Sequence, residues 1–209
     1  MPSNEPGIAR RTLVRGLVAA GIVAAAGIVG SGTGRAQGTD GATALVTALA
    51  KDLLALVTSG KSEAQIYSGF EGILSRYADM PAVAASVLGP PWRTASAAQK
   101  QAFVAAFQHY LSRRYGKQFR DYQSARIDVT GAKAGGKAGV LVSTKVVRPG
   151  KDDISVDWQV SDRSGQPKVV NLIIEGVSML ANERAEVGAV LDAQGGSLDG
   201  LVKQLKSTG

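Results

Sequence analysis

Residue types that carry out nucleophilic or metal chemistry are scarce in this chain of 209 residues. It has no cysteine and a single histidine, His109. The lack of cysteine excludes disulfides, thiolate zinc sites and thiol nucleophiles, and one histidine excludes a metal site built from several histidines. The residues left for a serine or acid–base mechanism are Ser178, Glu175, His109 and the acidic group Asp152, Asp153 and Asp157.

These residues do not form a recognisable catalytic arrangement. Ser178 lacks the Gly-x-Ser-x-Gly surroundings of a hydrolase nucleophile and is better explained as a helix N-cap. His109 falls on the polar side of a predicted helix, which is typical of a surface histidine, and Asp153 and Asp157 fall on the polar face of a predicted strand. We therefore expect no catalytic residue, no metal and no cofactor. A hydrolase that uses Ser178 is one alternative, and it requires His109 within hydrogen-bonding distance of Ser178.

The first 36 residues have the composition of an export signal. Arg10 and Arg11 precede a mildly apolar run, residues 16–30. The segment ends in residues 34–36 (GRA), which place small residues at the two positions that a signal peptidase recognises. The arginine pair resembles a twin-arginine signal, although ordinary Sec export stays an alternative. The apolar run is shorter than the roughly 20 residues needed to span a bilayer, so we predict cleavage after Ala36 and not a retained anchor.

Cleavage there divides the chain into a signal peptide, residues 1–36, and one mature domain, residues 37–209, which we expect in the periplasm. It also lowers the formal net charge from +7 to +4, because four basic residues and one acidic residue are removed. So small an excess does not indicate a nucleic-acid partner. Basic residues on one predicted helix offer a docking surface for an acidic partner, although such runs are usually only solvated: Arg113, Arg114, Lys117 and Arg120.

Helical periodicity covers the first half and the tail of the mature chain. The predicted helices span residues 40–58, 63–77, 79–89, 96–115 with an extension to 122, 180–193 and 197–205. Ser96 with Gln99 three residues on forms a capping box, which marks the start of the longest helix. The sequence GPPW, residues 89–92, predicts a bend because two prolines interrupt regular structure.

Between residues 127 and 174 the apolar residues alternate with polar ones, which is the period of a strand. The sequences RPGKDD and DRSGQP supply turns, so this region predicts an antiparallel meander with one apolar face. GAKAGGKAG lacks the spacing of a phosphate-binding loop and is predicted as a flexible turn. The predicted fold class is α+β: N-terminal helices packed on a twisted antiparallel sheet of about four strands, followed by C-terminal helices.

The aromatic residues are unevenly distributed. Ten of the eleven lie between Tyr67 and Tyr122, and the eleventh is Trp158 on the apolar face of the predicted sheet. Ordinary core packing explains this distribution, and so does the lining of an apolar pocket. Periodicity alone does not separate the two explanations.

Four segments in this order and spacing resemble the MlaC family of periplasmic phospholipid-binding proteins, also called toluene-tolerance auxiliary components. They are the bend VLGPPWR, the helix with the pattern F...F..YL...Y...F..Y, the junction EGVSML and the tail GGSLDGLVKQL. The resemblance covers essentially the whole mature chain. Two features depart from the family pattern: Asn171 stands where an aspartate is expected, and two prolines fill the bend.

The resemblance implies a carrier, not an enzyme. It implies that phospholipid acyl chains lie in an apolar cavity between helices and sheet, with the head group outside. It also implies two partners, an outer-membrane lipoprotein–porin complex and an inner-membrane Mce-type ABC transporter, in a system that maintains outer-membrane lipid asymmetry. Each methylene exposed to water costs about 0.8 kcal/mol, so one long acyl chain costs on the order of 10 kcal/mol. A dry cavity meets that requirement without any catalytic group.

The residues expected to contact lipid are apolar positions on the predicted helices and strands. From the helices they are Ile73, Leu74, Tyr77, Val83, Leu88, Trp92, Phe103, Phe107, Tyr110 and Leu111, and from the sheet Val142, Val146, Val156, Trp158, Leu172 and Ile174. Arg93 is the candidate for the mouth or the head-group phosphate, and a plain surface charge explains it equally well. Two further alternatives remain: the same fold with a hopanoid or other polycyclic lipid, and a periplasmic scaffold domain with a filled core.

Overall fold

The computed structural model describes residues 33–208, of which residues 33–37 and 120 by their backbone only. These residues belong to the compact unit Ser31–Gly209. Most of the predicted export signal therefore lies outside the described residues, and Ala36 falls in the first turn of the first helix. No helix in the described part of the chain is long and apolar enough to cross a membrane.

Most helices begin at a capping residue in the sequence, whereas α1 begins at Thr33, before the start predicted at residue 40. The helices are α1 (Thr33–Val57), α2 (Glu63–Tyr77), α3 (Met80–Leu88), α4 (Pro91–Thr94), α5 (Ala97–Gly116), α6 (Met179–Ala193) and α7 (Leu198–Ser207), with short 3₁₀ segments η1 (Lys117–Tyr122) and η2 (Gly136–Ala138). The predicted capping box of Ser96 and Gln99 is confirmed. The bend predicted at GPPW is present at Gly89 and Pro90, between α3 and α4, whereas Pro91 and Trp92 already belong to α4. Proline is tolerated at the N-cap and first position of a helix, because the N–H that it lacks would have no partner within the helix.

The sheet is an antiparallel meander in the order β1-β2-β3-β4-β5. Its strands are β1 (Arg126–Ala134), β2 (Val140–Val147), β3 (Ile154–Ser161), β4 (Lys168–Ile174) and the two-residue β5 (Val177–Ser178). The α+β prediction is confirmed, with five strands in place of about four. The flexible turn predicted at GAKAGGKAG is wrong in its first half, because β1 continues to Ala134 opposite Val140. Gly139 completes that hairpin at φ 87°, and a Cβ there would lie 2.0 Å from the carbonyl oxygen of Val160.

The junction EGVSML is a tight hairpin followed by a helix start. Glu175 and Gly176 have φ of 49° and 78°, as the two central residues of a two-residue hairpin turn require. Ser178 then caps α6 by accepting a hydrogen bond from the N–H of Ala181. The predicted N-cap role of Ser178 is confirmed.

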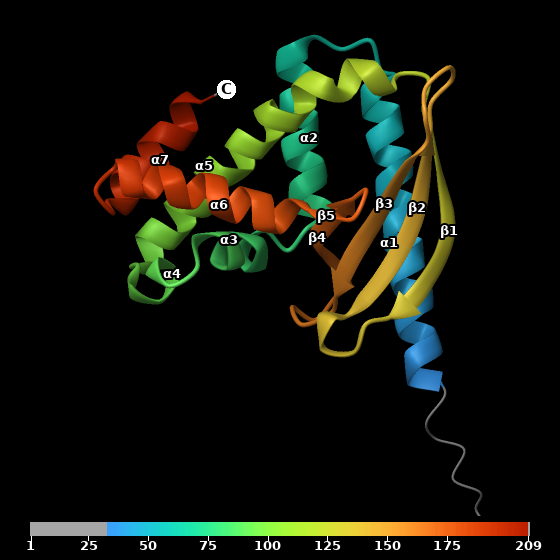
Figure 1. Cartoon of the computed structure of the whole chain (residues 1–209), viewed down its shortest axis with the longest axis horizontal. Helices are drawn as coiled ribbons and strands as arrows, with labels where there is room; N and C mark the ends of the chain where they lie inside the picture. Colours follow the sequence, from blue (N-terminus) through green and yellow to red (C-terminus); the bar gives the residue numbers. More distant parts are fainter. Residues whose placement is uncertain (1–32, 209) are drawn as a thin grey trace, which may run out of the picture. The chain divides into compact units, whose positions relative to one another are not determined.

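The buried side chains of the described residues form two clusters. The helical cluster joins α3, α5, α6 and α7 around Phe103, Phe107 and Leu201. The sheet cluster joins α1 and α2 to one face of β2, β3 and β4 around Val46 and Val142. Figure 1 shows α1 running along the sheet, with α5, α6 and α7 gathered beside one another. The protein therefore has two separate packing centres, the helical cluster and the sheet cluster.

Candidate functional site

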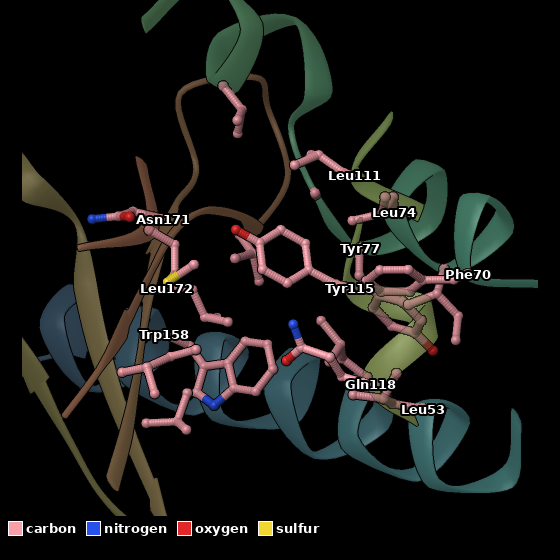
Figure 2. Close-up of a pocket in the computed structure, with 18 of the residues that line it drawn as sticks. Leu53, Phe70, Leu74, Tyr77, Leu111, Tyr115, Gln118, Trp158, Asn171 and Leu172 are labelled. Atoms are coloured by element: carbon pink, nitrogen blue, oxygen red, sulfur yellow. The ribbon is translucent and has the colours of Figure 1, made fainter. Parts of the chain in front are cut away.

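A cavity of about 300 Å³ lies where the helical cluster and the sheet cluster meet. Its wall takes Met80, Val87 and Phe107 from the helical cluster, and it takes Ile73 and Trp158 from the sheet cluster. Figure 2 shows the rings of Tyr115 and Trp158 near the middle, Leu172 on the side of β4, and Leu53 and Phe70 on the opposite side. The core of this protein is therefore hollow, and the hollow is lined mostly by apolar side chains.

Eleven of the residues expected from the sequence lie in the cavity wall. They are Ile73, Leu74, Tyr77, Val83, Phe107, Leu111, Val146, Val156, Trp158, Leu172 and Ile174. They come from three helices and three strands, and the fold brings them around one space. Their contact with lipid remains a prediction.

Five expected residues lie elsewhere, because both clusters contain solid packing as well as cavity wall. Leu88, Phe103 and Tyr110 are buried within the helical cluster, and Trp92 packs against its edge. Val142 is fully buried in the sheet cluster beneath α1. Four of these side chains are buried core residues and Trp92 is partly exposed, so the expectation that these five line the cavity is corrected.

The basic residues singled out from the sequence are dispersed. Arg93 is exposed on α4 and is absent from the cavity wall, so the structure lends its mouth role no support. Arg113 lies 3.6 Å from Glu71, and Arg114 pairs with acidic residues of α6. Of the four residues proposed as a docking surface, these two have their charges engaged within the protein.

Sequence reasoning missed several wall residues, which are spread over α1, α2, the end of α5, η1, the start of β1 and α6. They are Leu49, Leu53, Leu54, Val57, Phe70, Tyr115, Gln118, Phe119, Tyr122, Ala125, Ile127, Met179, Leu180 and Glu183, among others. Leu49, Leu53 and Val57 repeat every four residues, which places them on one face of α1. This spacing indicates an apolar face of α1, but it does not distinguish residues that pack on the sheet from residues that line the cavity.

Asn171 is a polar residue of the cavity wall, and its side chain forms hydrogen bonds with the first residues of α6 and its N-cap. Its amide points away from the Trp158 ring (Figure 2), and its Oδ1 accepts the N–H of Leu180 at 3.1 Å. Its Nδ2 donates to Ser178 Oγ at 3.1 Å. An aspartate at this position would accept the same N–H, so the departure from the family pattern keeps the contact that positions the helix.

Glu183 brings a carboxylate into the cavity wall from the second turn of α6. Its side chain is 5% exposed, and its Oε1 accepts a hydrogen bond from Tyr115 Oη at 2.5 Å. Arg114 Nε lies 3.5 Å from the same oxygen, and Arg114 Nη2 lies 3.7 Å from the exposed Glu186. Arg114 Nη1 also donates to Tyr110 Oη at 2.5 Å. We call these five residues the α5–α6 network.

The two tyrosines of the network stay protonated at neutral pH. Burial raises the pKa of Tyr110 to about 12, and the nearby Glu183 charge adds to the effect. Burial and the hydrogen bond to Glu183 raise the pKa of Tyr115 further. Tyr115 therefore keeps its proton and donates a hydrogen bond to Glu183 Oε1.

Ser178 and His109 have separate sets of partners. The Ser178 hydroxyl exchanges hydrogen bonds with Asn171 and accepts from the N–H of Ala181. His109 Nδ1 lies 3.0 Å from Glu71 Oε1 and 2.6 Å from Arg113 Nη1. The contact that the hydrolase alternative requires is thus not among the hydrogen bonds of these residues. His109 is also less exposed than expected, because it lies on the side of α5 that faces Glu71 of α2.

The fold and the cavity together define a class: α+β proteins in which helices close an apolar cavity against an antiparallel sheet. The family model described as MlaC protein matches residues 47–207. This chain belongs to the MlaC family.

Individual relatives are distant in sequence. The intermembrane phospholipid transport system binding protein MlaC of Haemophilus influenzae is 23% identical over 136 residues, which cover 63% of this chain and 63% of that protein. Among solved structures, the phospholipid-binding protein of Ralstonia solanacearum in complex with a phospholipid matches with a TM-score of 0.70 at 20% identity. That match covers 80% of this chain and 96% of the other, and it supports the shared fold.

Proposed function

We propose that this protein is a periplasmic carrier that holds phospholipid acyl chains in the cavity between its two clusters. The observation that carries the proposal is the cavity itself, about 300 Å³ in volume and apolar over most of its wall. Membership of the MlaC family supports it. So do the names of the two relatives, one a phospholipid transport protein and the other a phospholipid complex.

The volume of the cavity suits a long hydrocarbon chain. A water-sized group in a liquid occupies about 30 Å³, so a cavity of about 300 Å³ accommodates on the order of 10 methylene-sized groups. Burying each methylene is worth about 0.8 kcal/mol. One acyl chain would therefore contribute on the order of 10 kcal/mol, enough to hold a lipid that has left its membrane. This function needs no catalytic group.

Native mass spectrometry of residues 37–209 purified from a bacterial periplasm, with organic extraction, tests the proposal. The expected result is a stoichiometric adduct with the mass of a phospholipid. Protein that carries no lipid and takes none up from vesicles would contradict the carrier function and favour a scaffold. An adduct with the mass of a polycyclic lipid would keep the carrier function and change its cargo.

We also propose that the carrier exchanges lipid with an outer-membrane lipoprotein–porin complex and an inner-membrane Mce-type ABC transporter. The family resemblance suggests these partners, and the word intermembrane in the name of the Haemophilus relative supports a route between two membranes. Transfer of a labelled phospholipid from the loaded protein to each reconstituted complex is the direct test. Failure to donate to or accept from either complex would remove the partners but leave lipid binding intact.

A further inference from the structure

The cavity wall reaches the protein surface just beyond the C-terminal end of α5. Gln118 is the one wall residue that is exposed, whereas the other residues of the wall are buried or half-buried. Its amide points toward the middle of the pocket (Figure 2). Tyr122, four residues further along η1, also belongs to the wall and is half-buried. An amphipathic ligand with its chains in the cavity leaves its polar end at such an opening, because polar groups are costly in an apolar space.

Arg148 lies at this edge, directly beyond the apolar wall. Val146 and Ile154 are paired across β2 and β3, and both belong to the wall. Arg148 follows Val146 by two residues, so its side chain leaves the chain on the same face of the sheet. Its guanidinium carbon lies 5.7 Å from the centre of the Tyr122 ring. The cation is therefore held at the rim of the cavity, between η1 and the β2–β3 turn.

The guanidinium of Arg148 has donors left for an anion. Nη2 donates one of its two hydrogens to the carbonyl oxygen of Asp152 at 2.9 Å, and the buried Nε shows that the side chain is packed in place. Nη1 has no hydrogen-bond partner among the described residues and is not one of their buried atoms, so it is accessible. In the same turn the Asp153 carboxylate pairs with Lys145 at 3.3 Å. No ion pair in the described part of the chain includes Arg148.

We propose, building on the carrier function above, that Arg148 binds the phosphodiester of the bound lipid at the mouth of the cavity. Nη1 and the second hydrogen of Nη2 can donate together to two phosphate oxygens, and a charge-assisted bidentate contact of this kind is stronger than neutral hydrogen bonds. The acyl chains and their ester groups carry no charge, so the phosphate is the group that this cation distinguishes. Every glycerophospholipid contains that group. Arg148 therefore selects phospholipids against neutral lipids and does not select among head groups.

Competition between two lipids that differ only in the head group measures this selection. The lipid-free protein is loaded from vesicles of phosphatidylcholine with a smaller share of diacylglycerol that has identical acyl chains. Neither lipid adds net charge to the membrane. Native mass spectrometry then measures the total lipid per protein and the ratio of phospholipid to diacylglycerol, relative to their ratio in the vesicles.

The natural protein should favour the phospholipid by about tenfold or more. Arg148→Gln should lower the ratio by about the same factor, and Arg148→Lys should give an intermediate ratio, because lysine keeps the charge but not the bidentate contact. Arg126→Gln is the matched control. Arg126 lies at the same end of the sheet, opposite Val147, but it pairs with Asp128 at 2.8 Å and is absent from the wall. Its replacement should leave the ratio unchanged.

Circular dichroism checks the folding of each variant. An unchanged ratio in folded Arg148→Gln would overturn the inference, and an unchanged ratio in Arg148→Lys has the same meaning if the glutamine variant does not fold. Equal loading of the two lipids by the natural protein would overturn it as well. So would an equal fall in Arg126→Gln, which would indicate a general effect of net charge. All these results leave the carrier function standing, because total lipid per protein is measured separately, whereas absence of any lipid from the natural protein would contradict that function.

Discussion

Trp158 donates a hydrogen bond from Nε1 to Thr144 Oγ1 at 2.9 Å, across the neighbouring strands β3 and β2. Thr144 in turn donates to the carbonyl oxygen of Val156 at 3.0 Å and is 2% exposed. The polar edge of the indole is therefore satisfied within the sheet, and its apolar remainder is free to face the cavity. This pair fixes the orientation of the largest side chain in the wall.

Replacing Thr144 by valine keeps the shape of the side chain and removes the acceptor. The indole N–H is then buried without a partner, which should lower the free energy of unfolding by about 1–3 kcal/mol. Urea denaturation followed by tryptophan fluorescence measures the change. Thr144→Ser is the control, because it keeps the hydroxyl, and equal destabilisation by both variants would show that the hydrogen bond is not responsible.

A charge placed in the sheet side of the cavity should abolish lipid retention. Leu172 lies in the wall, whereas the next residue, Ile173, is absent from it and points to the opposite face of β4. Leu172→Arg should therefore yield folded protein without bound phospholipid, and Ile173→Arg should retain it. Circular dichroism checks folding, and native mass spectrometry measures lipid. Retention of lipid by folded Leu172→Arg would remove the sheet from the binding site.

Ser178→Ala tests whether this serine caps a helix or performs chemistry. Loss of the cap should lower the free energy of unfolding by about 1 kcal/mol and leave lipid binding unchanged. Ser178→Asp should restore most of the stability, because aspartate is also a good N-cap. A hydrolase would instead lose an esterase activity in both variants, so the natural protein and the two variants are assayed on lipid esters in parallel.

The α5–α6 network should make the protein less stable in alkaline solution. The pKa of Tyr110 is raised to about 12 and that of Tyr115 is raised further, both chiefly by burial. Above pH 10 the unfolded chain loses tyrosine protons that the folded protein keeps, so the free energy of unfolding falls as pH rises. Below pH 10 the contribution is fully present.

The slope for one such tyrosine is about 1.4 kcal/mol per pH unit between pH 10 and 12. Denaturant titrations at pH 9, 10 and 11 measure it for the natural protein and for Tyr110→Phe and Tyr115→Phe. Each variant should show a shallower decline than the natural protein. Identical slopes in all three proteins would contradict the assignment of the pH dependence to this network.

Local signals predicted the elements of this fold well, because caps and turns depend on near neighbours. The helix predicted over residues 63–77 has those bounds in the structure. The capping residue Ser178 and the antiparallel meander were also predicted correctly. The fifth strand was not predicted, because β5 has only two residues and pairs with β4 only through the tight turn at Glu175.

Membership of the cavity wall was harder to predict, because it depends on tertiary packing. Phe103 and Phe107 lie one turn apart on α5 and are both fully buried, yet only Phe107 lines the cavity. Glu183 has polar neighbours in the sequence of α6, which suggests that its side chain is exposed. Its partner Tyr115 is 68 residues away, so only the folded chain shows that the carboxylate is buried.

The hollow between the two clusters has a volumetric consequence. An apolar cavity of about 300 Å³ that water fills poorly is lost on unfolding, so hydrostatic pressure should favour the unfolded state of the lipid-free protein. A bound acyl chain occupies the same space and removes most of this volume change. The lipid-free protein should therefore unfold at much lower pressure than the loaded one, and the fluorescence of Trp158 in the wall reports the transition. The pressure at which the protein unfolds thus becomes a measure of whether the carrier is full or empty.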